Sequence, residues 1–432
     1  MVKWIYFLLL VRSQRVGRYE LQAPANNDYG RLKSNLPSLT GDARAAHYST
    51  DRMIGRGGYG EVWHALVLDR VAGLDIGEPV VMKKIHLTGK YHKVESGKRE
   101  VYFARLCRQH GVPHIPRFYD WFVADGHMWM VSEHRGENLL RLLFQGAEPT
   151  TTWMQLTSDN DRLLTFLRQL LIEVGQTLEG LDRLNVVHRD IKLSNLLVKN
   201  GSFSVIDFGS GLHYPAGDPT MFVDHFYQYE PPSTAQETAG YQPPLFGSSV
   251  CDALEDDFMR KHAYDLWGLA VVVLQILVGQ LDPFMSPNPR QVLRQYPCLM
   301  QEPHKIFFLN AGLYEPAHQD PPDIPVPYFR RELRWEQPAS LAPALAIDLL
   351  PGSPVAEVAP LSFDNGTCGV ADKHRHRKWK FLQSLRSQGV TLFDDSDRSA
   401  TLLMDLLFHM LLVNDTDKIS SSKALLRHPF LL

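Results

Sequence analysis

The spacing of hydrophobic residues changes about one third of the way along the chain. Residues 12–48 are mostly polar, and short apolar runs separated by turn residues follow them at 62–67, 80–82 and 128–131, which predicts strands. Beyond Asn138 the apolar residues recur at every third or fourth position, as on the buried face of a helix. The residues with this spacing are Leu163, Phe166, Leu167, Leu170, Leu171, Val174, Leu178 and Leu181. The pattern therefore predicts a small β-rich region followed by a larger helical one.

Prolines interrupt the helical pattern in the second half of the chain. Residues 283–360 hold 15 of the 28 prolines, and proline removes a backbone donor and clashes with the preceding helical turn. We therefore expect loops and extended segments there, as an insertion over about 283–390, with the apolar stretch Ile306–Leu309 packing on the helical region. Regular helix is expected to resume near Lys378–Ser387 and again over Ala400–Leu412.

Composition and charge are those of an ordinary globular protein. The chain has 432 residues, 44% hydrophobic and 22% charged, with a formal net charge of −3. Neither a disordered chain nor a broad basic surface for nucleic acid is indicated. One basic run, Lys373–Lys380, is interpreted as a solvated helix start or loop, with a docking or phosphate-contacting patch as the alternative. The four cysteines are scattered without a C-x-x-C pair, which indicates neither a zinc site nor a disulfide framework.

The N-terminus carries a short apolar run, Trp4–Val11, behind Lys3. The run is too short to span a bilayer, which takes about 20 residues, so no membrane span is expected. It has the character of a weak signal-peptide core, but charged residues separate it from the nearest small-residue site, and packing on the folded domain is favoured. Cytoplasm or nucleus is the expected compartment, while a secretory or organellar route stays open.

A glycine-rich segment lies between the first predicted strands. Residues 54–62 read Ile-Gly-Arg-Gly-Gly-Tyr-Gly-Glu-Val, a G-x-G-x-x-G-x-V pattern whose backbone can approach phosphate oxygens closely. A dinucleotide-binding turn has similar glycines but opens a helix, whereas here the strand-like run 62–67 follows. The pattern favours a loop between two antiparallel strands, with a plain glycine-rich hairpin as the alternative.

Lys83 lies within the apolar strand predicted over residues 80–85. Burying its ammonium is costly unless an anion neutralises it, and a nucleotide phosphate or a carboxylate would serve. Glu100, in a predicted helix over Lys98–Cys107, is the favoured carboxylate, and Glu95 is less favoured. If Lys83 merely faces solvent at a strand end, neither partner is required.

The densest group of polar motifs follows the long helical stretch. His188-Arg189-Asp190 precedes Asn195, and Asp207-Phe208-Gly209 begins twelve residues after Asn195. With the glycine-rich segment and Lys83 before them, these motifs have the order and spacing of eukaryotic protein kinases, which the chain resembles from about residue 50 to 431. The resemblance is poor over 283–390.

The resemblance implies a bilobal α+β fold. Residues 1–49 would form an N-terminal extension, 50–135 a small β-rich N-lobe, and 136–432 a larger, mainly helical C-lobe. The proline-rich insertion at about 283–390 would belong to the C-lobe.

The resemblance also implies roles in phosphoryl transfer, a reaction that depends on positioning and charge neutralisation. Asp190 would orient the acceptor hydroxyl and take up its proton, and Lys192 would steady the transferred phosphate. Lys83 would hold the α- and β-phosphates and pair with Glu100. Thr238, in a segment similar to the kinase T-x-x-Y-x-A-P-E motif, would contact Asp190. Together, Lys192 and Thr238 resemble serine/threonine rather than tyrosine kinases.

The implied cofactors are ATP and Mg²⁺. Asn195 and Asp207 would hold the cation with amide and carboxylate oxygens. The residues expected around the nucleotide are Ile54, Gly55, Gly57, Gly60, Val62, Val81, Lys83, Glu133, Arg135 and Leu197. Glu133 and Arg135 would offer backbone groups to adenine, and the small Ser132 would occupy the gatekeeper position.

Three positions depart from the kinase pattern. Leu245 stands where a glutamate is usual, and Lys418 replaces the arginine that pairs with it, so Lys418 is expected in solvent. Ala104 lies one turn after Glu100, where a larger apolar residue usually stacks on Phe208. Candidate phosphorylation sites in the long segment 210–238 are Thr220, Ser233 and Thr234.

The sequence therefore predicts a serine/threonine protein kinase whose partners are a protein substrate and an upstream kinase or activator, with no nucleic acid. One alternative is a catalytically weak or inactive kinase-like scaffold, which the altered Leu245 and Ala104 would suit. Another is a small-molecule or lipid kinase. The segments Thr238–Pro244 and Asp265–Trp267 argue against the latter, because both resemble the protein-substrate lobe of protein kinases.

Overall fold

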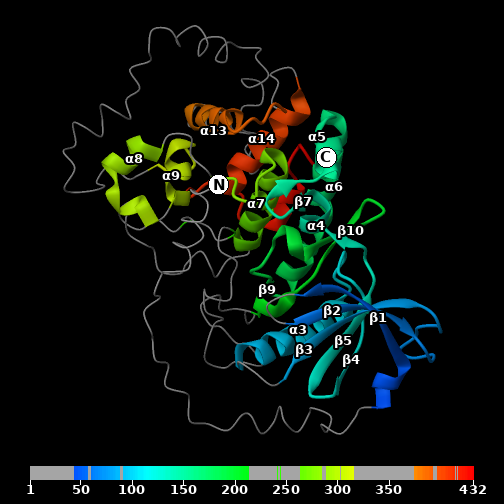
Figure 1. Cartoon of the computed structure of the whole chain (residues 1–432). Helices are drawn as coiled ribbons and strands as arrows, with labels where there is room; N and C mark the ends of the chain where they lie inside the picture. The colour runs from blue at the N-terminus through cyan, green and yellow to red at the C-terminus, as the bar shows by residue number, and fades with distance from the viewer. Residues whose placement is uncertain are drawn as a thin grey trace, which may run out of the picture.

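Two regions of different architecture follow one another along the chain (Figure 1). The computed structural model describes residues 43–56, 60–87, 91–213, 241, 244, 263–284, 289–301, 303–315, 374–392, 397–413, 415 and 417–432. The first region is a five-stranded antiparallel sheet with one long helix, and the second is built mainly of helices. This arrangement confirms the predicted α+β fold, with a small β-rich region before a larger helical one.

The sheet of the first region has the strand order β1-β2-β3-β5-β4. Its strands are β1 (Tyr48–Arg56), β2 (Gly60–Val67), β3 (Pro79–His86), β4 (Phe118–Ala124) and β5 (His127–Glu133). The three apolar runs from the sequence lie within β2, β3 and β5, as predicted. Strand β1 begins within the stretch that looked polar: Tyr48 is buried and stacks on Phe122, with 5.9 Å between ring centroids. A 3-10 turn, η1 (Ala43–His47), precedes it.

Helix α3 (Tyr91–His110) packs against one face of this sheet. Alternate residues of a strand face opposite sides, so Met128 of β5 joins Val101 of the helix, while Val131 joins the cluster on the other face. Gly97 permits the close approach, since a Cβ there would lie 2.7 Å from Met128 Cε. The helix is therefore seated close to the central strands.

Three long helices organise the second region. They are α6 (Asn160–Arg183), α7 (Ala263–Val278) and α14 (Arg398–Leu411), and α7 packs against both of the others. The apolar residues predicted to share a helix face all lie in α6, and all but Phe166 are buried. The helix predicted over 400–412 corresponds to α14. No helix among the described residues is long and apolar enough to cross a membrane.

Shorter elements connect these helices. The remaining helices are α4 (Leu139–Leu143), α5 (Thr151–Thr157), α8 (Pro289–Gln295), α9 (Pro303–Asn310), α13 (Arg375–Ser387) and α15 (Ser422–Leu426), with 3-10 turns η2 (Leu193–Asn195), η3 (Phe208–Ser210) and η5 (Pro297–Gln301). The short strands are β6 (Glu137–Asn138), β7 (Phe144–Gln145), β8 (Glu148–Pro149), β9 (Val186–Val187), β10 (Leu196–Lys199), β11 (Ser202–Val205) and β12 (Leu212–His213). β10 pairs with β11 and β6, and β9 pairs with β12. These ladders hold the ends of the two segments that carry Asp190 and Asp207.

The proline-rich segment departs from the prediction where it is described. Instead of loops and extended chain, the structure has α8 over Pro289–Gln295, η5 over Pro297–Gln301 and α9 over Pro303–Asn310. Pro289, Pro297 and Pro303 are the first residues of these three elements, a position where a missing N–H is not needed. The expected packing of the stretch 306–309 is confirmed, because Phe308 is fully buried against Trp267. Residues 316–373 lie outside the described residues.

Three residues of the basic run at 373–380, His374, Arg377 and Lys378, are buried, which contradicts the solvated interpretation. Arg377 and Lys378 of α13 are 8% and 5% exposed. Acidic side chains distant in sequence explain the burial: Lys378 pairs with Asp405 of α14, and Arg377 Nη1 lies 2.5 Å from Asp415 Oδ2. The helix expected near 378–387 is confirmed as α13, which begins inside this run.

Two further expectations are corrected. The ammonium of Lys418, expected in solvent, is buried 4.8 Å from the ring centroid of Trp267, and burial lowers the pKa of Lys418. Cys107 is free and buried, but Cys298 is disulfide-bonded, which the scattered spacing did not indicate. The error at Lys418 concerns a contact between segments far apart in the sequence.

Candidate active site

The glycine-rich segment joins two antiparallel strands, as predicted. β1 and β2 pair with Gly55 opposite Val62, while residues 57–59, which include Gly57, lie outside the described residues. Gly60 is required by a close approach, because a Cβ there would lie 2.0 Å from the carbonyl oxygen of Lys84 in β3. A strand after the glycines excludes the dinucleotide-binding alternative, which needs a helix there.

Three of the predicted site residues share one face of the sheet beside this segment. Val62 pairs with Lys83 across β2 and β3, and Val81 lies two residues before Lys83. Side chains directly opposite and two residues apart point to the same side of a sheet. The structure thus places two apolar side chains next to the lysine.

The other predicted nucleotide contacts lie where the two regions meet. Ile54 in β1 is half-buried, and its carbonyl oxygen accepts a hydrogen bond from Arg141 of α4. Leu197 in β10 is also half-buried and pairs with Asn138. Glu133 ends β5 and Arg135 follows it in the link between the regions.

Glu133, where the link segment begins, already forms bonds within the protein. The amide N–H of Glu133 donates to the carbonyl oxygen of Arg117 at 2.9 Å, and its carboxylate lies 2.8 Å from Nε of Arg135. A ligand at this segment would therefore have to use main-chain groups other than the Glu133 N–H.

Lys83 bridges two carboxylates from different elements. Its Nζ lies 2.5 Å from Glu100 Oε2 in α3 and 3.1 Å from Asp207 Oδ1, which follows β11. All three side chains are largely buried. The structure therefore brings together three predicted site residues that are separated by up to 124 positions in the chain.

Burial and charge oppose one another in this cluster. Burial raises the pKa of Glu100 to about 7, and Lys83 offsets only part of the effect. Burial would lower the pKa of Lys83, but the charges of Asp207 and Glu100 outweigh it and raise that pKa. Burial would raise the pKa of Asp207, yet the ammonium of Lys83 prevails and lowers it. At neutral pH the site therefore holds a protonated lysine beside an ionised aspartate.

Asp190, Lys192 and Asn195 form a second polar group. Lys192 Nζ lies 2.7 Å from Asp190 Oδ2. Asn195 Nδ2 donates to both the carbonyl oxygen and Oδ2 of Asp190, at 2.9 Å each. Both amide hydrogens of Asn195 are thereby used, and its Oδ1, which accepts a hydrogen bond from Ser194 Oγ at 3.4 Å, is the side-chain atom able to bind a cation.

Asp265, at the start of α7, holds the main chain of this second group. Its two carboxylate oxygens accept the N–H groups of His188 and Arg189, at 2.7 Å each. Sequence reasoning noted Asp265 only within a motif and missed this contact. The signal was an acidic residue opening a helix that is otherwise buried along its length.

His188 links the two segments that carry Asp190 and Asp207. Its Nδ1 accepts the N–H of Asp190 at 3.2 Å, so its Nε2 carries the proton and donates to the carbonyl oxygen of Ile206 at 3.1 Å. Arg189 and Asp207 both have left-handed φ angles, +64° and +70°. Each such residue costs about 1–3 kcal/mol and persists only where its surroundings hold it.

The apolar contact on Phe208 comes from Phe103 rather than from residue 104. Phe103 is fully buried, and its ring centroid lies 6.1 Å from that of Phe208, whose ring also lies 4.7 Å from the ring of His188. Ala104 instead packs with the cluster between α3 and the sheet. The expected contact exists, but the residue that supplies it lies one position earlier in the helix.

Several predicted residues cannot be placed. Thr238, Leu245 and the candidate phosphorylation sites Thr220, Ser233 and Thr234 lie outside the described residues. Tyr241, from the same motif as Thr238, is described: its hydroxyl donates to Gln275 Oε1 of α7 at 2.9 Å.

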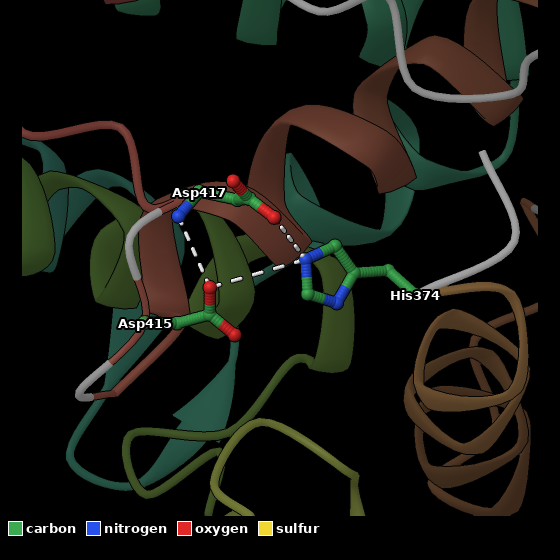
Figure 2. Close-up of side chains that lie close together, drawn as sticks. All are labelled: His374, Asp415 and Asp417. Atoms are coloured by element: carbon green, nitrogen blue, oxygen red, sulfur yellow. Dashed lines mark hydrogen bonds and ion pairs between the residues drawn. The ribbon is translucent and has the colours of Figure 1, made fainter. Parts of the chain in front are cut away.

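A second group of potential metal ligands lies between α13 and the segment after α14 (Figure 2). His374, Asp415 and Asp417 each offer a ligand atom within 4.8 Å of one another. His374 Nε2 lies 2.6 Å from Asp417 Oδ2, and the N–H of Asp417 donates to Asp415 Oδ1 at 3.0 Å. Arg377 Nη1 donates to the other Asp415 oxygen. Because hydrogen bonds within the protein satisfy these groups and Arg377 supplies positive charge, the cluster is explained as a structural network.

Comparison with known proteins agrees with this arrangement. A probable serine/threonine-protein kinase of Bacillus subtilis, YbdM, is 31% identical over 183 residues, covering 41% of this chain and 63% of that protein. Aurora kinase A-A of Xenopus laevis is 25% identical over 285 residues, covering 63% and 59%. A probable inactive protein kinase of Arabidopsis thaliana is 26% identical over 228 residues, covering 42% and 57%. The chain thus spans less than two thirds of the length of each.

The family match extends over most of the chain. Residues 48–431 match the protein kinase domain, a range that begins at the first residue of β1 and ends one residue before the last of the chain. It includes both polar groups and the glycine-rich segment. The chain belongs to the protein kinase family.

Proposed function

We propose that this chain is an active serine/threonine protein kinase, which transfers the γ-phosphate of Mg-ATP to a hydroxyl group of a protein. The observation that carries the proposal is the assembly of two polar groups where the two regions meet. They are Lys83 with Glu100 and Asp207, and Asp190 with Lys192 and Asn195. Keeping so many charges out of water is costly, and a purely structural role does not require it.

Lys83 would bind the phosphates of the nucleotide. Its raised pKa keeps the ammonium protonated at neutral pH, and a lysine ammonium binds phosphate oxygens as a point charge. Glu100 holds Nζ in place at 2.5 Å. The main chain between Gly55 and Gly60 would add amide donors to the phosphates.

Asn195 and Asp207 would hold Mg²⁺. Carboxylate and amide oxygens suit this hard cation, Asp207 is ionised, and Asn195 Oδ1 accepts only a long hydrogen bond of 3.4 Å, from Ser194, among the described residues. When bound, the cation would neutralise charge on the phosphate oxygens.

Asp190 would orient the acceptor hydroxyl and take up its proton as the new bond to phosphorus forms. Lys192 and Asn195 fix the Asp190 carboxylate through hydrogen bonds to Oδ2. Lys192, at 2.7 Å from Asp190, would also meet the transferred phosphoryl group with its positive charge.

The preference for serine and threonine is supported by Lys192 and by two relatives named as serine/threonine kinases; Thr238 would contact Asp190. A protein substrate and an upstream kinase or activator are the partners we propose. Location in the cytoplasm or nucleus stays a prediction from the sequence.

An inactive or weakly active scaffold is the second candidate. The relative named as a probable inactive kinase and the altered Leu245 and Lys418 favour it. The small residue Ala104 no longer favours the scaffold, because Phe103 supplies the apolar contact on Phe208. The scaffold alternative predicts nucleotide binding without turnover.

The experiment is phosphate transfer from γ-labelled Mg-ATP to three acceptors: the protein itself, a generic basic protein, and a mixture of hydroxylated metabolites with phosphoinositide vesicles. We expect label on serine or threonine of protein acceptors. Label on the metabolites or lipids alone would overturn the protein-kinase assignment. No transfer at all, by wild type or by the variants Thr220→Glu, Ser233→Glu and Thr234→Glu, with Mg-ATP still raising the melting temperature, would favour the scaffold.

A further inference from the structure

Arg99, the residue before Glu100 in helix α3, reaches the segment that carries Asp207. Its Nη1 donates a hydrogen bond to the carbonyl oxygen of Gly209 at 3.3 Å, and the residue is only 3% exposed. The helix comes close here, since a Cβ on Gly209 would lie 2.2 Å from Ser96 Oγ. Burying a guanidinium is unfavourable, so packing alone would be served better by an apolar residue.

Neighbouring side chains of the same helix hold the two residues before Gly209. Glu100 binds Lys83, which in turn binds Asp207, and Phe103 packs on Phe208. With Arg99, three side chains of α3 therefore restrain three successive residues, 207, 208 and 209. The hydrogen bond from Arg99 to Gly209 does not involve Lys83, so it is separate from the Lys83–Glu100 and Lys83–Asp207 ion pairs.

Asp207 needs support of this kind because its main chain is left-handed, with φ +70° and ψ +73°. A residue with a Cβ keeps that conformation only where the surroundings impose it. Fixing the carbonyl of Gly209, two residues later, restricts rotation of the chain that follows Asp207. The guanidinium of Arg99 therefore acts on the direction in which the Asp207 carboxylate points.

We propose that Arg99 is a positioning residue for phosphoryl transfer: by fixing the Gly209 carbonyl it sets the orientation in which Asp207 meets Mg²⁺. The inference rests on the proposed function, in which Asp207 binds the cation. It makes the placement of Asp207 depend on the placement of helix α3 even when the Lys83–Glu100 pair is intact.

The test compares Arg99→Gln with Arg108→Gln. Arg108 lies in the same helix, is exposed, and donates to the carbonyl oxygens of Phe118 at 2.7 Å and Tyr119 at 3.4 Å, so the control removes bonds from an arginine to main-chain carbonyls away from the segment. The rate of phosphate transfer is measured against Mg²⁺ concentration at saturating ATP. We expect Arg99→Gln to lower kcat and to raise the Mg²⁺ concentration for half-maximal rate, each by about 10-fold, the loss expected for one hydrogen bond from a charged donor. Arg108→Gln should leave both within about twofold.

A second variant covers the case in which Arg99→Gln fails to fold. Arg99→Lys keeps the buried positive charge and should show a smaller shift in the same direction. Folded Arg99 variants with wild-type Mg²⁺ dependence would overturn the proposal, even if their melting temperatures fall. Absence of phosphate transfer both in wild type and in the variants Thr220→Glu, Ser233→Glu and Thr234→Glu would instead overturn the proposed function. In that case the Mg²⁺ dependence of ATP binding is compared between wild type and Arg99→Lys. A higher Mg²⁺ requirement in Arg99→Lys supports the inference, and an unchanged requirement overturns it.

Discussion

Gly60 lies where the glycine-rich turn enters β2, beside the backbone of β3. A Cβ added there would lie 2.0 Å from the Lys84 carbonyl oxygen, whereas at Gly55 the nearest atom would be Val62 Cβ at 3.6 Å, an ordinary contact. Gly60→Ala should therefore lower the free energy of unfolding by about 1–3 kcal/mol, the usual cost of overpacking. Denaturant unfolding of Gly60→Ala and Gly55→Ala checks this, and equal losses in the two variants would contradict it.

Glu100 makes stability depend on pH in the nucleotide-free protein. Because burial raises its pKa to about 7 from an ordinary 4.5, the folded state keeps a proton that the unfolded chain releases between these values. Its contribution to stability is full below pH 4.5 and is lost as pH rises through 7.

As pH rises from 5 to 7, the free energy of unfolding of wild type should therefore fall relative to that of Glu100→Gln, which cannot ionise. Above pH 7 the difference between the two proteins should level off. The change is at most about 3 kcal/mol, from 1.36 kcal/mol per pKa unit. Denaturant unfolding of both proteins at several pH values measures it. A difference that is constant with pH, or that changes in the opposite direction, would show that the environment of Glu100 is misjudged.

At the scale of elements, a buried charge holds helix α13 to α14. Lys378 pairs with Asp405 Oδ1, and His428 Nε2 lies 3.2 Å from Asp405 Oδ2. Lys378→Met should lower the free energy of unfolding by about 3–5 kcal/mol, because it leaves the carboxylate buried without its cation. Adding Asp405→Leu should recover part of the loss.

The matched control is Lys423→Met in α15, where the lysine is exposed; it should change the free energy of unfolding by less than about 0.5 kcal/mol. Urea unfolding of the three variants provides the comparison. A Lys378→Met loss no larger than that of the control would mean that α13 is held by its apolar face alone.

Elements with regular periodicity could be predicted from the sequence, and those defined by distant partners could not. Helix α6 follows from its apolar spacing, because most of its buried face is aliphatic. The short helices over 289–310 were missed, since a proline count does not show that the prolines stand at helix starts. The basic run was misjudged because Asp405 and Asp415, which neutralise it, lie 27 and 38 positions from their partners.

The same holds for the site at the scale of the whole molecule. The order of the motifs predicted that Lys83 would meet Glu100, and the structure brings them together. It could not predict that Asp265 would hold the main chain at His188, or that Phe103 rather than residue 104 would meet Phe208. Those contacts depend on how α7 and α3 are rotated about their axes, which only tertiary packing decides.

The central claim is that the site built from both regions transfers phosphate, with Asp190 as the base. The most direct measurement is the single-turnover rate of γ-phosphate transfer by wild type and Asp190→Asn, with ATP binding measured alongside. The exposed Asp161→Asn on α6 is the control. We predict that Asp190→Asn binds Mg-ATP as wild type does but transfers phosphate at least about 100-fold more slowly, as loss of a general base implies. Transfer by Asp190→Asn at the wild-type rate would contradict the account.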